Sequence, residues 1–146
     1  MANYCCVVRT NYFRVKDEEK FKELMSRAYA SEDQISVWEK TAVDGTKLFG
    51  FGCYSGIGGV RNAECDEDDD ADETAYDEFI DGLQTCVASG DAIIIMESGN
   101  EKLRYITGLA TVITENDCQY LDIVNLAVKK GTEMLSNSDW TTTCWY

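Results

Sequence analysis

The chain contains no histidine and no proline. Without histidine, the side chain best suited to proton transfer near neutral pH is missing. Neither a Ser–His nor a Cys–His nucleophilic arrangement can form within the chain. Carboxylates are plentiful, but no pair stands out as the acid and base of glycoside hydrolysis. We therefore predict that the protein is not an enzyme.

Long apolar runs are also absent. The longest, Ala92–Met96, has the length of a strand, far short of the ~20 residues of a membrane-spanning helix. The first residues, Met1–Cys6, lack a positively charged stretch followed by an apolar block, so we expect no signal peptide. These features predict a cytoplasmic protein that is not inserted in a membrane.

Cysteine is present, but not in a metal-binding pattern. The seven cysteines are odd in number and irregularly spaced, and no Cys-x-x-Cys motif occurs. A zinc site would have to gather cysteines alone from scattered positions. We expect reduced thiols that pack as small hydrophobic side chains, and we predict no metal and no cofactor.

The pattern of apolar residues predicts one α+β domain spanning residues 1–146. We expect an antiparallel sheet with two or three helices on one face, in the order β-α-β-β-α-β-β-α and possibly ferredoxin-like in its first half. The aromatic residues are expected to pack in the core and on the sheet. The expected strands are 4–15, 35–42, 47–54, 91–97 and 102–114, with a short edge at 141–146, and the expected helices are about 17–30, about 74–88 and one that begins at Asp122.

Local signals support several of these boundaries. Asp17 and Asp122 are suited to cap helices, and Thr74 starts a sequence that resembles a capping box. Asp44-Gly45 is a strong signal for the turn of a β-hairpin. The glycine-rich segment 55–59 lacks the Gly-Lys-Ser/Thr of a phosphate-binding loop and precedes many acids, so we interpret it as a turn.

Basic residues are missing from one long stretch. Eleven of the 27 acidic residues lie between Glu64 and Asp81, where no lysine or arginine occurs, whereas the rest of the chain has 16 acids and 13 bases. The densest part predicts an acidic loop at about 64–73. The eleven residues are Glu64, Asp66, Glu67, Asp68, Asp69, Asp70, Asp72, Glu73, Asp77, Glu78 and Asp81.

This acidic run has three interpretations. It can be a solvated loop that keeps the protein soluble. It can also imitate a polyanion, because duplex DNA presents one negative charge per ~1.7 Å and helical residues four apart lie on one face. The third is a calcium loop, since Asp66-x-Asp68-x-Asp70 begins like an EF-hand. However, the sixth position is Ala71 and the twelfth is Asp77.

Segments 11–19, 90–97 and 100–105 resemble small acidic proteins of bacterial plasmids, integrative elements and phages. The strand–helix opening is also similar to the ferredoxin-like domain of Api92/YubB-type mobile-element proteins. Many small acidic accessory proteins of such elements are anti-restriction or anti-CRISPR factors that imitate DNA. The resemblance implies an anti-defence setting and supplies no functional residues.

Together these observations favour a non-enzymatic inhibitor. It would present the eleven acids to the basic groove of a host nucleic-acid-binding protein, such as a restriction enzyme or CRISPR effector, and would not bind nucleic acid directly. The alternative is a regulatory or immunity-type interaction module that makes contacts through its sheet face or through Trp145-Tyr146. A calcium-responsive module is the third possibility.

Overall fold

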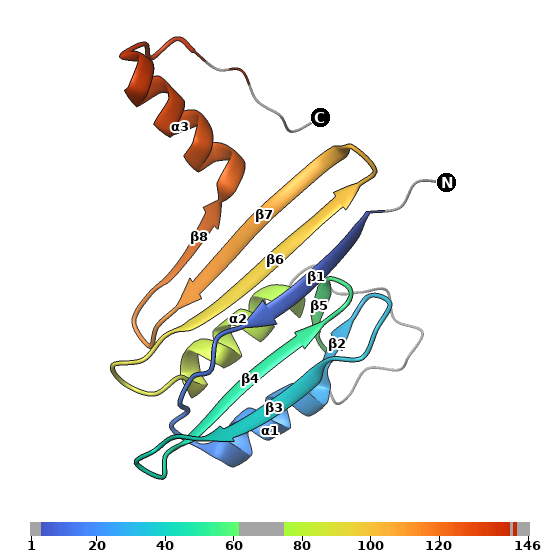
Figure 1. Ribbon diagram of the computed structural model, residues 1–146. Helices are drawn as coiled ribbons and strands as arrows, with labels where there is room; N and C mark the ends of the chain where they lie inside the picture. The colour runs from blue at the N-terminus through green and yellow to red at the C-terminus, as the bar shows by residue number, and fades with distance from the viewer. Residues whose placement is uncertain (1–3, 62–74, 141, 143–146) are drawn as a thin grey trace.

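The computed structural model describes residues 4–61, 75–140 and 142. The chain has an α+β fold built on a six-stranded antiparallel sheet, with a separate two-stranded sheet beside it (Figure 1). The strands are β1 (Cys5–Thr10), β2 (Ala28–Ala30), β3 (Ser36–Thr41), β4 (Lys47–Cys53), β5 (Ile57–Val60), β6 (Ile93–Glu101), β7 (Arg104–Ile113) and β8 (Cys118–Asp122), and the helices are α1 (Glu18–Arg27), α2 (Ala75–Cys86) and α3 (Ile123–Leu135).

The large sheet has the strand order β3-β4-β1-β6-β7-β8. Its first four strands form two interleaved split βαβ units. β4 lies between β1 and β3, which are connected through α1, and β1 lies between β4 and β6, which are connected through α2. This arrangement is ferredoxin-like, as expected for the first half of the chain. β7, β8 and α3 extend the sheet beyond that unit.

The start of α1 follows from its capping residue. The Asp17 carboxylate accepts hydrogen bonds from the backbone N–H groups of Glu19 and Lys20, at 3.0 and 3.2 Å. The expected helix at 17–30 is wrong in its last turn. Residues 28–30 are extended because they form β2, which pairs with β5. Pairing with a neighbouring segment thus ends the helix before its apolar pattern does.

The Asp44-Gly45 turn is confirmed. The Asp44 carboxylate accepts a hydrogen bond from the backbone of Thr46 at 2.9 Å, and Gly45 has φ +88°, which glycine adopts without strain. The two strands on either side, β3 and β4, pair antiparallel from Thr41 opposite Lys47 to Ser36 opposite Gly52.

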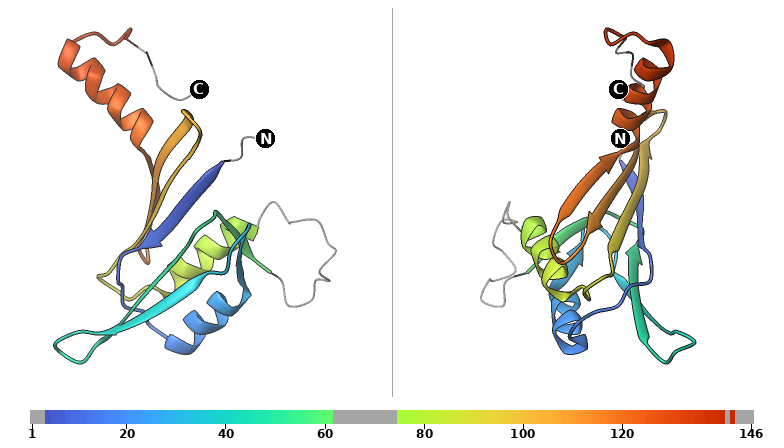
Figure 2. Two further views of the ribbon diagram at one scale, coloured as in Figure 1. Left: turned by 45° about the vertical axis from the view of Figure 1, so that its right-hand side comes forward. Right: turned by 90° about the vertical axis from the view of Figure 1, so that its left-hand side faces the viewer.

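The core lies between the sheet and the helices α1 and α2, which pack on one face of it (Figure 2). We call this face the inner face. All five phenylalanines of the chain meet there, and neighbouring rings lie 5.0–6.2 Å apart, mostly edge to face. Aromatic packing therefore supports the sheet where the two βαβ units interleave. The five are Phe13, Phe21, Phe49, Phe51 and Phe79.

The third helix extends away from the sheet beyond the end of β8 (Figures 1 and 2). Its predicted start at Asp122 is confirmed, because the Asp122 carboxylate accepts a hydrogen bond from the backbone of Val124 at 2.9 Å. Val124 is the one buried residue of this helix, whereas Ile123 and Met134 are 57% and 78% exposed. Apart from residue 142, the expected edge strand at 141–146 lies outside the described residues. Within the described part of the chain, no helix has the length and apolar character needed to cross a membrane.

Candidate functional site

Three of the eleven predicted acidic residues lie on α2. Asp77, Glu78 and Asp81 are exposed on the side of the helix opposite the buried Phe79 and Leu83. We call these three residues the α2 acidic stripe. The other eight predicted site residues lie outside the described part of the chain. They are Glu64, Asp66, Glu67, Asp68, Asp69, Asp70, Asp72 and Glu73.

The basic residues of the molecule do not neutralise Asp77 or Asp81. All 13 lysines and arginines lie within the described ranges, and none of them forms an ion pair with Asp77 or Asp81. The ion pairs instead join other acids. An example is Lys16 with Glu115 at 2.8 Å. Asp77 and Asp81 therefore retain their negative charge without a counter-charge from the protein's own described cations.

The N-terminal end of α2 is fixed by a close contact with β5. Gly59 has φ +140°, and a Cβ built on it would lie 2.7 Å from the backbone nitrogen of Tyr76 and closer still to the carbonyl of Ala75. The backbone N–H of Arg61 donates to the carbonyl of Arg27 at 2.8 Å. Strand β5 and the start of α2 thus pack directly against each other, and the residue that follows β5 is hydrogen-bonded to the end of α1.

No metal centre is visible among residues 4–61, 75–140 and 142, because no three His, Cys, Asp or Glu side chains there could hold an ion together. The EF-hand-like residues Asp66, Asp68 and Asp70 lie outside these ranges. The calcium interpretation stays a prediction.

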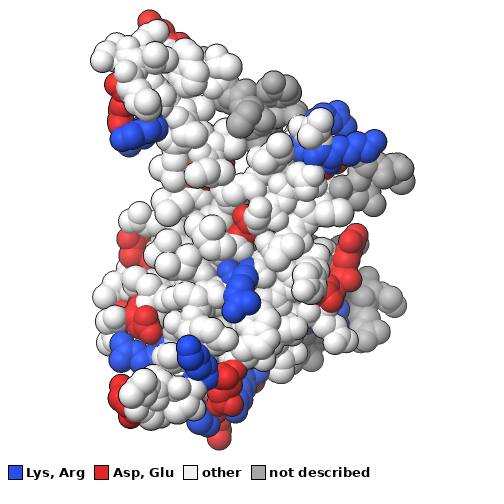
Figure 3. All heavy atoms as spheres, viewed as in Figure 1, with Lys and Arg blue, Asp and Glu red and all other residues white. Residues whose placement is uncertain are grey.

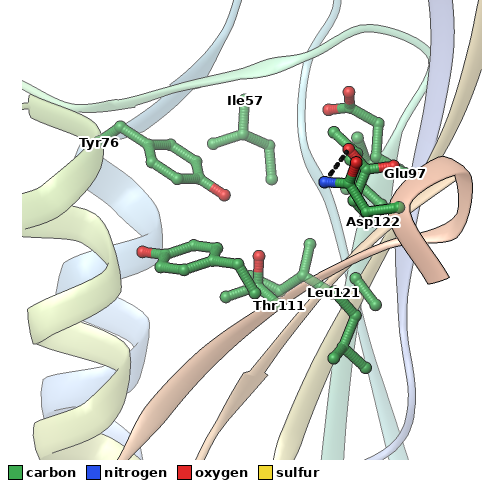
Figure 4. Close-up of a pocket in the computed structure, with 12 residues that line it drawn as sticks. Ile57, Tyr76, Glu97, Thr111, Leu121 and Asp122 are labelled. Atoms are coloured by element: carbon green, nitrogen blue, oxygen red, sulfur yellow. Dashed lines mark hydrogen bonds between the residues drawn. The ribbon is translucent and has the colours of Figure 1, made fainter. Parts of the chain in front are cut away.

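A second feature, which we did not predict from the sequence, is a cavity of about 540 Å³ on the inner face beside α2 (Figure 4). The sheet register builds its floor. Glu97, Leu109 and Asp122 lie directly opposite one another on β6, β7 and β8. Ile95, Thr111 and Tyr120 form the next row. The cavity therefore carries carboxylates on two strands that flank an apolar one.

Side chains of α2, β5 and α3 surround this floor. Tyr76 of α2 and Ile57 of β5 lie on one side, opposite Glu97 and Asp122 (Figure 4). At the edge near α3, the Asn125 side-chain amide lies 3.5 Å from the Asp122 carboxylate, to which it donates a long hydrogen bond. With Val8 of β1, apolar and polar groups thus face the same space from seven different elements.

The two carboxylates of the cavity are only partly satisfied. Glu97 accepts a hydrogen bond from the Tyr4 hydroxyl at 3.2 Å through its Oε2 atom. Asp122 accepts from the backbone of Val124 through Oδ1. Neither carboxylate forms an ion pair with any lysine or arginine of the chain, all of which are described. Each is half-buried, so the cavity has negative charge and reduced access to water.

The tyrosines of the cavity remain protonated. Burial raises the pKa of Tyr76, an effect that a hydrogen bond with the Thr111 side chain partly offsets. Loss of hydration, followed by the neighbouring Cys118 thiol, raises the pKa of Tyr120 to about 12. Both rings are therefore neutral phenols at physiological pH.

The sequence carried one partial signal for this site. Glu97 ends the apolar run of β6, which places a charge at the border of a buried strand. Glu97 and Asp122 lie in one row only because β7 pairs with both β6 and β8 in this register. The spacing of residues along the chain predicts neither strand β8 nor this register.

The face of the sheet opposite α1 and α2 is open. It shows few charged side chains over its middle (Figure 3), and we call it the outer face. Val7, Met96 and Ile106 project from it and are about half exposed, at 50%, 50% and 51%. The outer face therefore exposes apolar side chains from three neighbouring strands.

Comparisons of the chain with protein-family models, with curated proteins and with solved structures found no match. The class of the protein is therefore defined by its own fold and surfaces. It is an α+β protein with a ferredoxin-like unit, an acidic helix face and a partly apolar cavity. The resemblance to mobile-element proteins stays a prediction.

Proposed function

We propose that the protein is a non-enzymatic inhibitor that binds the basic groove of a nucleic-acid-binding protein. The observation that carries this proposal is the α2 acidic stripe. Its residues Asp77 and Asp81 are exposed and have no ion pair with any described lysine or arginine. In the sequence, eight further carboxylates directly precede α2.

Charge spacing supports the choice of partner. Residues four apart on a helix have Cβ atoms ~5–6 Å apart, so Asp77 and Asp81 form a short row of charge along α2. A groove that evolved to bind phosphates presents lysines and arginines along a similar row. Attraction between the two surfaces would accelerate association and weaken with salt. A restriction enzyme or a CRISPR effector offers such a groove.

Neutralising the acidic run tests the proposal. Replacing Asp66, Asp68, Asp69 and Asp70 with Asn removes four charges. We expect capture of a nucleic-acid-binding partner from host lysate to weaken about tenfold, or ~1.4 kcal/mol. Raising the salt concentration should abolish capture by the unaltered protein. Mass spectrometry identifies the partner, and inhibition of that partner is then measured directly.

A matched control removes the same charge elsewhere. Glu19, Glu32, Glu133 and Asp139 are exposed carboxylates outside the acidic run. Replacing these four with Gln or Asn changes the net charge equally and should leave capture nearly unchanged. Equal losses in the two variants would mean that only the net charge matters, and the proposed surface would be wrong.

The proposed location is the cytoplasm, where such partners act. Among the described cysteines, Cys6, Cys53, Cys86 and Cys118 are free thiols. Free thiols in this number are typical of a reducing compartment, which supports the location.

The outer face supports a second candidate function, an interaction module that does not imitate nucleic acid. Met96 and Ile106 are each about half exposed on that face. Replacing both with Lys should leave an inhibitor of the first kind active. Loss of partner binding in a variant that still folds, judged by circular dichroism, would favour the interaction module. The Trp145-Tyr146 pair, which we also considered for this role, lies outside the described residues.

A further inference from the structure

The geometry points to a second binding site, in the cavity beside α2, for an organic cation. The ligand would carry a protonated amine or a guanidinium group on a short apolar chain. This inference does not rest on the proposed function, because it concerns the inner face of β6, β7 and β8 and uses none of the residues of the α2 acidic stripe.

The size and floor of the cavity suit a small organic group. Its volume of about 540 Å³ lies within the ~300–1,000 Å³ typical of small-molecule sites. Val8, Ile95 and Leu109 contribute aliphatic surface to it. An apolar chain lying on this surface would remove hydrocarbon from water, which favours binding. The aliphatic floor alone would accept many ligands, so the charged groups of the cavity determine which chemical class of ligand binds.

The carboxylates select a cation. Glu97 and Asp122 lie on either side of Leu109 in one row of the sheet, so their Cα atoms are roughly 10 Å apart. Both are half-buried, and no lysine or arginine of the chain pairs with them. An anion would be repelled here. A neutral ligand would remove water from the carboxylates and supply no counter-charge, which is unfavourable.

Glu97 keeps a free acceptor for the donors of such a cation. Oε1 of Glu97 accepts no hydrogen bond from any described group, whereas its Oε2 accepts from Tyr4. An ammonium has three donors and a guanidinium has five. Charge-assisted hydrogen bonds of this kind are shorter and stronger than neutral ones. A cation above Leu109 could therefore reach Glu97 on one side and Asp122 on the other.

Two aromatic rings of the cavity also favour an organic cation. Tyr76 lies across the cavity from the two carboxylates (Figure 4), and Tyr120 follows Thr111 in the adjacent row of the sheet. The face of a neutral phenol attracts a cation within about 6 Å of the ring centre. The combination of two carboxylates, two tyrosines and an aliphatic floor thus favours an alkylammonium or alkylguanidinium over an inorganic ion.

This cation can come from two sources, a free small amine or the side chain of a basic residue on another protein. Two probes distinguish them. Agmatine carries an ammonium and a guanidinium on a four-carbon chain. The capped tripeptide acetyl-Gly-Arg-Gly-amide presents the same guanidinium on a backbone. Binding of each to the full chain is measured by calorimetry and by amide chemical shifts, at fixed ionic strength and in excess magnesium.

We expect saturable binding with shift changes at Glu97, Leu109 and Asp122. Glu97→Gln and Asp122→Asn should each weaken it about tenfold. Asn caps a helix as well as Asp does, so the start of α3 is preserved in the second variant. The control is Glu19→Gln, an equal charge change at an exposed carboxylate of α1, which should weaken binding less than about twofold.

Each outcome decides the inference. Saturable binding of agmatine identifies a free amine as the ligand class, and binding of the tripeptide alone identifies the side chain of a partner. Failure of both probes to saturate overturns the proposal. An equal loss in Glu19→Gln and Glu97→Gln also overturns it, because binding would then follow the overall negative charge. None of these results bears on the α2 acidic stripe, whose variants are tested separately.

Discussion

Replacing Gly59 with Ala should destabilise the fold strongly, because two independent effects act at this position. The backbone has φ +140°, where a residue with a Cβ is strained by about 1–3 kcal/mol. The added Cβ would also meet the backbone of Ala75 and of Tyr76, at 2.7 Å from the Tyr76 nitrogen. Backbone cannot rotate aside as a side chain can, so this overpacking adds about 1–3 kcal/mol.

Together the two effects predict a loss of roughly 2–6 kcal/mol in the free energy of unfolding, a large part of the ~5–15 kcal/mol typical of a domain. Gly45→Ala is the matched control, because Gly45 also has positive φ, +88°, but nothing lies within 4 Å of its Cβ position. That variant should lose only about 1–2 kcal/mol. Urea unfolding of both variants measures the difference. Equal losses would refute the contact between β5 and the start of α2.

Three further predictions concern the core, a cap and a thiol. Phe51→Ala should cost about 3–5 kcal/mol in urea unfolding, since Phe51 is fully buried between the rings of Phe13 and Phe79, and a loss under 1 kcal/mol would contradict this packing. Asp17→Ala should cost about 1 kcal/mol by removing the cap of α1, whereas Asp17→Asn should be nearly neutral. Burial raises the pKa of the Cys6 thiol from 9.0 to about 11, so its stabilising contribution is complete below pH 9 and is lost as the pH rises toward 11. Urea midpoints at about pH 8 and about pH 10.5 should therefore differ less in Cys6→Ala than in the unaltered chain, and an unchanged difference would exclude this thiol as a cause.

Elements with strong local signals were predictable from the sequence. The Asp44-Gly45 turn and the helix that begins after Asp122 are both present, because turn and cap chemistry act over a few residues. The order of the helices and of the longer strands followed from the same local patterns. The glycine-rich segment 55–59, interpreted as a turn, is instead largely part of strand β5, because residues 57–60 pair with β2. Strand β2 was missed because its residues continue the apolar pattern of α1, and only pairing with β5 makes them extended.

Strand β8 and the cavity were not predictable in the same way. Residues 118–122 carry a weak strand pattern, and they become a strand by pairing with β7. That pairing places Asp122 in one row with Glu97, which is 25 positions earlier in the sequence, and no spacing along the chain encodes this neighbourhood. For the acidic run, helical spacing correctly predicted that Asp77 and Asp81 share an exposed face.

Helix α3 does not face a core as its apolar pattern would suggest. Leu126, Met134 and Leu135 are exposed by 46%, 78% and 57%, although they belong to an apolar pattern that normally faces a core. Trp140 returns to the helix, and a Cβ on Gly131 would lie 2.6 Å from its ring. The helix thus has a packed end and an apolar side that the described part of the chain leaves exposed.

If the acidic run occupies the place of nucleic acid on its partner, the protein and duplex DNA must compete for the same groove. The purified partner is bound to the labelled protein, and duplex DNA is added while the bound fraction is followed by fluorescence anisotropy. We expect DNA to displace the protein fully, and Asp77→Asn combined with Asp81→Asn to make displacement easier. A ternary complex, in which DNA binds while the protein stays bound, would contradict it.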